Sequence, residues 1–259
     1  MKKISALIIA CSVGLAAQAQ IIDPLTGGLA NYTATTILDN SSGAGLGVSF
    51  TSSASGLQAN YVGTGTSAEQ ALFWAPASSF STTFAVGEML TVNVAIPASS
   101  TAMDFGLAVA AATPVAASAG NAWSSRTLFD FASVSVRPSQ TAIRANTSVS
   151  GSLVTANGVI SSVNPTTVGA LFIQWNSADV FTLGYIDTGG VQHVSETTPT
   201  FASSSTIGTE IGFYGDLRAT GTSLGEFSNL TIAAIPEPSS LALCAMSLAA
   251  LAAVLRRKK

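Results

Sequence analysis

Positive charge is scarce in this sequence, and most of it stands at the two ends. Six of the ten lysines and arginines occupy positions 2–3 and 256–259. Residues 20–235 keep four arginines and no lysine against twelve acidic residues, which gives a net charge of −8. An acidic surface of this kind repels phosphate backbones, so we expect no nucleic-acid partner.

Cysteine is nearly missing as well. Both cysteines, Cys11 and Cys244, lie in the terminal segments. Residues 20–235 can therefore form no internal disulfide, and their fold must be held by a packed core alone.

Metal ligands are equally sparse. His193 is the single histidine, and without cysteine beside it the usual zinc ligand sets are excluded. We expect no catalytic residues and no resident metal. Calcium is the one cofactor left open, because Asp39, Asp179 and Asp187 lie in predicted loops and carboxylates suit a hard cation.

The N-terminus has the features of a secretory signal peptide over residues 1–19. Lys2-Lys3 form the positive n-region, Ile4–Leu15 is apolar, and Ala17-Gln18-Ala19 supplies the small residues that signal peptidase requires. We predict cleavage after Ala19, which leaves Gln20 as the new N-terminus. A lipobox ending at Cys11 is the competing interpretation, but it would shorten the apolar run to about seven residues.

The C-terminus carries a second composite signal. Pro236-Glu237-Pro238 precedes an apolar stretch that we predict to be a transmembrane helix over residues 240–255, and Arg256-Arg257-Lys258-Lys259 ends the chain. The stretch is shorter than the roughly twenty residues of a comfortable span, although snorkelling flanks and local thinning of the bilayer permit insertion. The terminal cations would stay in the cytoplasm.

This order of Pro-Glu-Pro, short apolar helix and basic end resembles the PEP-CTERM signal of Gram-negative bacteria. The resemblance covers residues 236–259 and implies an exosortase-like membrane protease as a partner, in addition to signal peptidase. It also implies export across the inner membrane, C-terminal anchoring, and a final location at the cell surface or outside the cell after processing. An ordinary C-terminal anchor is the alternative.

Between the two ends, residues 20–235 have the pattern of an all-β domain. Short β-branched or aromatic runs are interrupted by Gly, Asn, Asp or Ser roughly every 8–12 residues, which is typical of a sandwich or barrel. The predicted strands are Tyr32–Leu38, Gly47–Thr51, Leu57–Val62, Ala71–Trp74, Met89–Ile96, Phe105–Ala110, Phe129–Arg137, Ala142–Ser148, Ala170–Trp175, Val180–Ile186, Val191–Ser195, Glu210–Tyr214 and Glu226–Ile232.

The number and spacing of these strands favour a two-sheet antiparallel jelly-roll sandwich. Residues 171–194 form the clearest unit, a three-strand meander with turns at 176–179 and 187–190. The final run Gly225–Ile232 and the opening Thr36–Asn40 resemble concanavalin A-like, laminin-G-like domains, and the likeness spans most of residues 20–235.

Two patterns suggest hydrolytic chemistry without completing it. Gly221–Gly225 fits the G-x-S-x-G expression of serine hydrolases around Ser223, but a strand rather than a helix is predicted to follow. Glu210 and Asp216 come nearest to the carboxylate pair of a glycoside hydrolase, with a glycine turn predicted between them. His193, the only side chain available as a histidine base, is expected on the solvent face of its strand.

The three tryptophans are the candidate sugar-stacking residues. Trp74 and Trp175 are flanked by apolar strand residues, and we predict that both belong to the core. Trp123 stands in a loop of small and polar residues and is the candidate ligand-binding residue, because an exposed indole offers a flat apolar face and a hydrogen-bond donor.

Together with the export signals, these features predict a non-enzymatic protein of the cell envelope or biofilm matrix with a structural or adhesive role. A lectin-like carbohydrate-binding module, with exopolysaccharide as its partner, is the first alternative. A degenerate glycoside hydrolase or esterase is the second.

The two sorting signals make a prediction about the ends of the native protein. Mass spectrometry of terminal peptides from the envelope and the culture medium should find an N-terminus at Gln20 and a C-terminus near Pro236. An intact tail ending at Lys259 in the inner membrane would instead identify a simple anchored periplasmic protein.

Overall fold

The structure is a computed structural model that describes residues 19–27, 32–38, 48–61, 69–80, 84–100, 102–110, 131–149, 152–177, 180–197, 210–217 and 223–235. These residues form fifteen β-strands and three short 3-10 helices, η2 (Ala77–Ser79), η3 (Pro138–Gln140) and η4 (Pro165–Thr167), and they contain no α-helix. Every strand pairing is antiparallel, so the prediction of an all-β antiparallel fold is confirmed.

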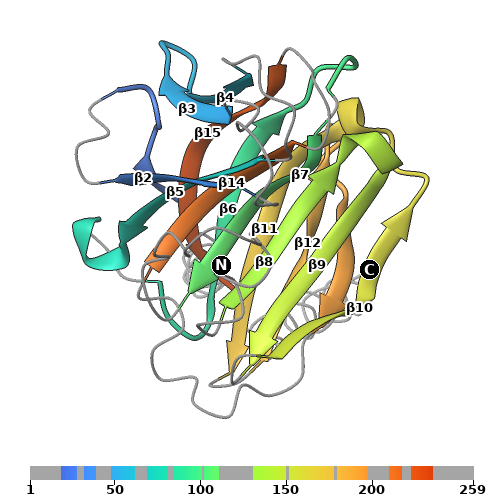
Figure 1. Ribbon diagram of the computed structural model, residues 1–259. Coiled ribbons are helices and arrows are strands. Elements are labelled where there is room, and N and C mark those ends of the chain that lie inside the picture. The colour runs from blue at the N-terminus through green and yellow to red at the C-terminus, as the bar shows by residue number, and fades with distance from the viewer. Residues whose placement is uncertain are drawn as a thin grey trace, which may run out of the picture.

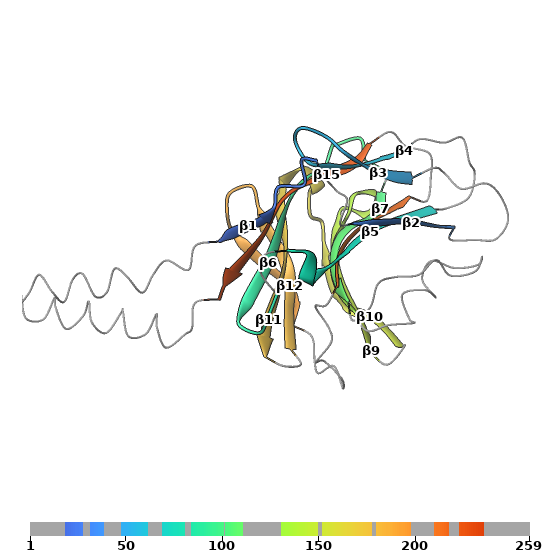
Figure 2. The ribbon, with the colours of Figure 1, turned by 90° about the vertical axis from the view of Figure 1, so that its left-hand side faces the viewer.

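Two sheets pack face to face, and Figure 2 shows them as separate layers. Sheet A runs in the order β13 (Gln192–Thr197), β12 (Val180–Asp187), β11 (Val168–Ser177), β6 (Glu88–Ala95), β15 (Ser223–Ala234), β4 (Leu57–Tyr61) and β3 (Val48–Ser52), and β1 (Gln20–Asp23) also pairs with β15. Sheet B runs in the order β10 (Ser152–Ser161), β9 (Ala142–Val149), β8 (Phe131–Arg137), β7 (Ala102–Ala110), β14 (Glu210–Leu217), β5 (Glu69–Pro76) and β2 (Thr33–Leu38) (Figure 1).

The core lies between the sheets and follows the two-residue period of the strands. Along β6, Leu90, Val92 and Val94 are buried against sheet B, whereas the residues between them lie on the outer face. At the centre Phe105 of β7 stacks on Phe227 of β15, with ring centroids 3.9 Å apart and planes at 8°. One aromatic pair therefore joins a strand of each sheet.

The N-terminal strand is built into the sandwich. β1 begins at Gln20, which pairs with Ile232 of β15. The carboxylate of Asp23 accepts a hydrogen bond from the hydroxyl of Tyr32 at 2.8 Å and another from the N–H of Leu25 at 2.7 Å. Burial, reinforced by the Asp23 carboxylate, raises the pKa of Tyr32, so this hydroxyl remains a donor.

Every predicted strand overlaps an observed one, but two observed strands were not predicted. β1 is too short to show a period. β10 pairs with β9, yet its register shifts between Val154 and Gly158, which breaks the alternation on which the prediction depended. No described helix is long and apolar enough to cross a membrane, and the predicted helix over 240–255 lies outside the described residues.

The predicted meander is confirmed as β11, β12 and β13. In the turn between β12 and β13, one carboxylate oxygen of Asp187 accepts the N–H groups of Gly189 and Val191, both at 2.9 Å. The other oxygen lies 2.9 Å from Nε2 of His193, whose ring stacks on Tyr185 with centroids 4.6 Å apart. The side chain of His193 is 38% exposed and so reaches solvent as predicted, but its ring is also held by Asp187 and Tyr185, which the sequence did not indicate.

The aromatic pair at the centre gives a stability prediction. Phe227 is fully buried, so Phe227→Ala should lower the free energy of unfolding by about 3–5 kcal/mol in guanidinium denaturation. Val86 is 50% exposed, and Val86→Ala should change it by less than about 0.5 kcal/mol. Equal losses in the two variants would contradict the packing described.

The Asp187 turn gives a pH prediction. The hydrogen bond from His193, followed by those from the N–H groups of Val191 and Gly189, holds the pKa of Asp187 below its usual value. A lowered pKa means that the ionised carboxylate stabilises the folded chain above the unfolded-state value of about 3.9, and that this contribution is lost as the pH falls through the folded-state value. Asp187→Asn should therefore reduce the melting temperature near pH 6 and progressively less toward pH 2. A pH-independent difference between the two proteins would argue against this role.

Candidate functional site

Two of the places where described polar side chains gather outside the core are candidate ligand sites. One is the outer face of sheet B, and the other is a depression on the outer face of sheet A. They differ in accessibility, which decides between them as ligand sites.

The outer face of sheet B carries aromatic and polar residues in ordered rows. Strand register aligns Trp74, Gly212, Ala108, Ser133 and Asn146 in one row, and Tyr214, Gly106, Ser135 and Arg144 in the next, across β5, β14, β7, β8 and β9. Core residues such as Phe213 and Leu107 alternate with them and point to the other side of the sheet.

Two glycines let the aromatic rings lie flat on this face. A Cβ at Gly212 would stand 2.1 Å from the indole of Trp74, and one at Gly106 would stand 2.5 Å from the ring of Tyr214. Both rings are almost fully buried, at 4% and 3% exposure. The two aromatics therefore belong to a second apolar cluster, separate from the core between the sheets.

The polar groups of the same face are buried too. Asp104 forms an ion pair with Arg137, with Nε 3.0 Å from Oδ1, and accepts a hydrogen bond from the hydroxyl of Ser135 at 2.7 Å. The side-chain amide of Asn146 is fully buried and makes no hydrogen bond to any described residue. Since these side chains are almost completely buried, this face is not an open binding surface.

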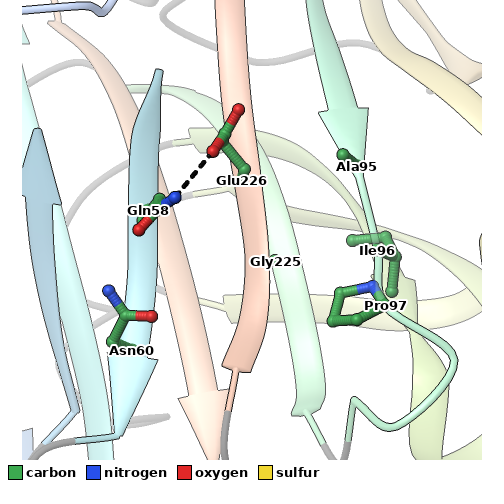
Figure 3. A pocket seen from close by; sticks show the side chains of 7 residues that line it. All are labelled: Gln58, Asn60, Ala95, Ile96, Pro97, Gly225 and Glu226. Atoms are coloured by element: carbon green, nitrogen blue, oxygen red, sulfur yellow. Dashed lines mark hydrogen bonds between the residues drawn. The ribbon is translucent and has the colours of Figure 1, made fainter. Parts of the chain in front are cut away.

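The depression on sheet A is open to solvent. It has a volume of about 490 Å³ and is lined by Gln58 and Asn60 of β4, Gly225 and Glu226 of β15, and Ala95, Ile96 and Pro97 at the end of β6 (Figure 3). It forms because β6 pairs with β15 only as far as Ala95, opposite Glu226, whereas β4 pairs with β15 as far as Ser223. Pro97 has no N–H with which to extend the ladder.

Gly225 shapes the floor of the depression. The register of β15 against β4 shifts between Ser223 and Gly225, and Gly225 has φ of 154°, where L side chains are rare. A Cβ at this position would lie 2.9 Å from Cδ1 of Ile96 and 3.0 Å from Cε1 of Phe105. A glycine is required here because the backbone touches the core directly.

Glu226 is held in position by its neighbours. Its Oε2 accepts hydrogen bonds from the hydroxyl of Ser55 and the side-chain amide of Gln58, both at 2.9 Å. The side-chain amide of Asn60 donates to the hydroxyl of Thr51 at 3.1 Å. Within the described structure the remaining side-chain oxygens of Glu226, Gln58 and Asn60 accept no hydrogen bond. The depression thus presents free acceptors beside an apolar wall.

The acid pair suggested by the sequence is not a catalytic pair. Glu210 and Asp216 both lie on β14, which runs without a turn from Glu210 to Leu217, so the predicted glycine turn is wrong. Six residues along a strand separate them by about 20 Å, whereas cooperating glycosidase carboxylates lie roughly 5–9.5 Å apart. The register does set Asp104 opposite Asp216, but the carboxylate of Asp104 is already engaged in its ion pair.

Ser223 does not stand in a nucleophile elbow. It is the first residue of β15, and the chain continues as a strand to Ala234. An elbow needs a helix directly after the serine.

The tryptophans divide between two environments. Trp175 packs against the core, with its ring 5.2 Å from that of Phe181 and 5.5 Å from that of Phe84. Trp74 is buried as predicted, but on the outer face of sheet B and not between the sheets. Trp123 lies outside the described residues, so its role in ligand binding stays a prediction.

Other sequence candidates fall at or beyond the described limits. Ala17, Pro236-Glu237-Pro238 and the basic end lie outside, as do Asp39 and Asp179, while Ala19 and Gln20 stand at the start of the described chain. The carboxylate of Asp187 already accepts hydrogen bonds from the N–H groups of its turn and is paired with His193. The described residues contain no group of three or more His, Cys, Asp or Glu side chains able to hold a metal ion.

Sequence reasoning missed the residues of the depression. Gln58 and Asn60 were visible as the polar positions of a predicted strand, and Glu226 as the first residue of another. Nothing local indicates that these strands are neighbours, since 168 positions separate Gln58 from Glu226. The register that joins them is a property of the whole sheet.

Comparison with known proteins identifies the C-terminal segment. Residues 234–259 match the family model described as the PEP-CTERM protein-sorting motif, as predicted. This motif indicates export and C-terminal processing by an exosortase. A comparison with curated proteins found no match.

A solved structure with a TM-score above 0.5 identifies the fold of the sandwich. The lumenal domain of VIP36, in a form bound to Ca²⁺ and Man3GlcNAc, is 7% identical, with a TM-score of 0.52 over 83% of this chain and 89% of that one. The carbohydrate-binding module CBM66 from Bacillus subtilis is 10% identical, with a TM-score of 0.43 over 79% and 96%. An endo-β-galactosidase from Clostridium perfringens is 7% identical, with a TM-score of 0.49 over 83% and 61%. At such identities the likeness concerns the fold alone, and this chain combines a concanavalin A-like β-sandwich with a C-terminal PEP-CTERM sorting motif.

Proposed function

We propose that this protein is a non-enzymatic component of the cell envelope or biofilm matrix, delivered by the exosortase route, with a structural or adhesive role. The observation that carries the proposal is the sorting motif, which matches from residue 234, where β15 ends. The tail follows the last strand directly, so its removal would leave every described strand in place.

The positions of the chain ends support a surface-displayed sandwich. Gln20, the predicted new N-terminus, pairs with Ile232, two residues before β15 ends. Both predicted processing points therefore lie at one end of the domain. The opposite end, with the depression, is the part that the tail would hold away from the membrane.

Charge supports a hydrated, uncharged surrounding rather than a polyanionic one. Residues 20–235 carry a net charge of −8, and Arg137, one of their four arginines, is engaged with Asp104. A protein with so few free cations gains little from anionic polymers and is repelled by them at low salt. Neutral polysaccharide is the better match.

The acid positions favour a non-catalytic role over the hydrolase alternative. Glu210 and Asp216 stand too far apart, Asp104 is ion-paired, and Ser223 is in a strand. Activity on glycan or ester panels that disappears in Glu210→Ala or Ser223→Ala would revive the hydrolase alternative.

The matrix role predicts a phenotype that depends on the tail. A deletion strain should form biofilm with reduced cohesion, and the full chain should restore it. A chain ending at Ile235 should be exported yet fail to restore cohesion, because it lacks the sorting motif. Immunoblots of the medium confirm that the shortened chain is made. Unchanged matrix composition and cohesion in the deletion strain would refute the proposal.

A further inference from the structure

We propose that the depression on sheet A binds one uncharged pyranose unit of a polysaccharide, with Glu226 and Asn60 as its principal hydrogen-bond acceptors. This inference rests on the proposed matrix role and deepens it by naming the ligand class and the residues that recognise it.

The first argument is the fixed geometry of the acceptors. Glu226 is directly opposite Gln58 in the register, and Ser55 and Gln58 together immobilise one oxygen of its carboxylate. The other oxygen is left for a ligand, with a side-chain oxygen of Asn60 two residues further along β4. Strands lie about 4.8 Å apart and alternate residues about 6.6 Å apart, so these acceptors span the width of a sugar ring with its hydroxyls.

Pre-organisation makes these acceptors effective. A side chain that is already held loses little rotamer freedom when a ligand binds, whereas a free side chain loses more. Hydroxyl donors to an ionised carboxylate also form stronger bonds than donors to a neutral oxygen. Glu226 therefore suits a ligand rich in hydroxyl groups.

The second argument is the apolar wall. Ala95, Ile96 and Pro97 line the side of the depression that faces the polar residues of β4 (Figure 3). One polar and one apolar side match a pyranose, whose hydroxyls project around a ring that carries C–H groups on its faces. The volume of about 490 Å³ lies within the roughly 300–1,000 Å³ of small-ligand sites and holds one such ring with room to spare.

The third argument is charge. The described lining residues include a carboxylate and neither lysine nor arginine, so they disfavour uronic acids, sulfated sugars and phosphate groups. A neutral sugar meets no such repulsion. A divalent cation is disfavoured because the described lining residues supply a single carboxylate, whereas calcium sites in proteins combine several carboxylate and carbonyl oxygens.

The fourth argument is position. Glu226 precedes Ala234, the last residue of β15, by eight residues, or about 26 Å along the strand. The depression thus lies at the end of the central strand that is far from the sorting motif. A rigid strand also positions ligand-binding groups better than a loop does.

The test uses ¹⁵N-labelled protein purified from the fraction in which it accumulates. Methyl glycosides of glucose, galactose, mannose and N-acetylglucosamine are titrated while the side-chain amide signals of Gln58 and Asn60 are followed by NMR. At least one glycoside should shift these signals in a saturable way. Methyl glucuronide should bind at least tenfold more weakly than the matching neutral glycoside.

Glu226→Gln keeps the shape of the side chain and an oxygen that accepts the hydrogen bonds from Ser55 and Gln58, but it replaces the free acceptor by an NH2 donor and removes the charge. It should therefore weaken binding about tenfold. Glu88→Gln is the matched control. Glu88 lies on the same sheet at the opposite end of β6, and its carboxylate accepts a hydrogen bond from the N–H of Ala85. It should leave the affinity unchanged. Melting temperatures of both variants establish that each is folded.

Three outcomes would overturn the inference. They are saturable binding that Glu226→Gln leaves intact, amide shifts produced by Ca²⁺ alone without any glycoside effect, and no shift with any glycoside up to high millimolar concentration. None of these outcomes bears on the proposed matrix role, which is tested separately by the biofilm cohesion of the deletion strain. If the deletion strain loses cohesion but no glycoside binds in the depression, the proposed function stands and this ligand site is rejected.

Discussion

Aromatic packing between two sheets is what the rest of this structure depends on, because residues 20–235 have no cysteine with which to cross-link them. Phe227 of sheet A is stacked on Phe105 and lies 4.9 Å from Phe213, both of sheet B. Rings of Phe50, Phe73 and Tyr32 continue this contact toward the edge formed by β2 and β3. The hydrophobic effect of these buried rings substitutes for covalent bridges in an exported domain.

The same packing constrains the candidate ligand site. Gly225 must lack a side chain because Ile96 and Phe105 lie directly beneath it. The bulge that this glycine permits sets Glu226 at the place where β6 has ended, and Gln58 reaches across from β4 to hold it. The floor of the depression is thus part of the core, whereas its rim carries the proposed ligand-binding groups. Substitutions at the floor would be felt as loss of stability, whereas substitutions at the rim would not.

Much of the fold could be predicted from the sequence because the strand signal is local. The runs around Leu171 and Phe181 show β-branched and aromatic residues with turn formers between them, and the meander followed from these alone. The site could not be predicted, because it depends on register between distant strands. The flat position of Trp74 on Gly212 is of the same kind, since a tryptophan in an apolar strand gives no sign of which face of the sheet it occupies.

The pairing of β15 on both of its edges determines how the domain resists a pulling force on its C-terminal tail. β15, from whose end the tail continues, is hydrogen-bonded to β6 on one side, and to β4 and then β1 on the other. A pull on Ala234 runs along the strand, whereas its ladder bonds lie across it, so both rows of bonds are sheared together instead of being peeled apart one by one. One of the strands that hold β15 is the short segment from Gln20 to Asp23, which signal cleavage at the predicted position would leave intact. Cleavage a few residues later would remove one of the three strands that keep β15 from sliding out of the sheet under tension.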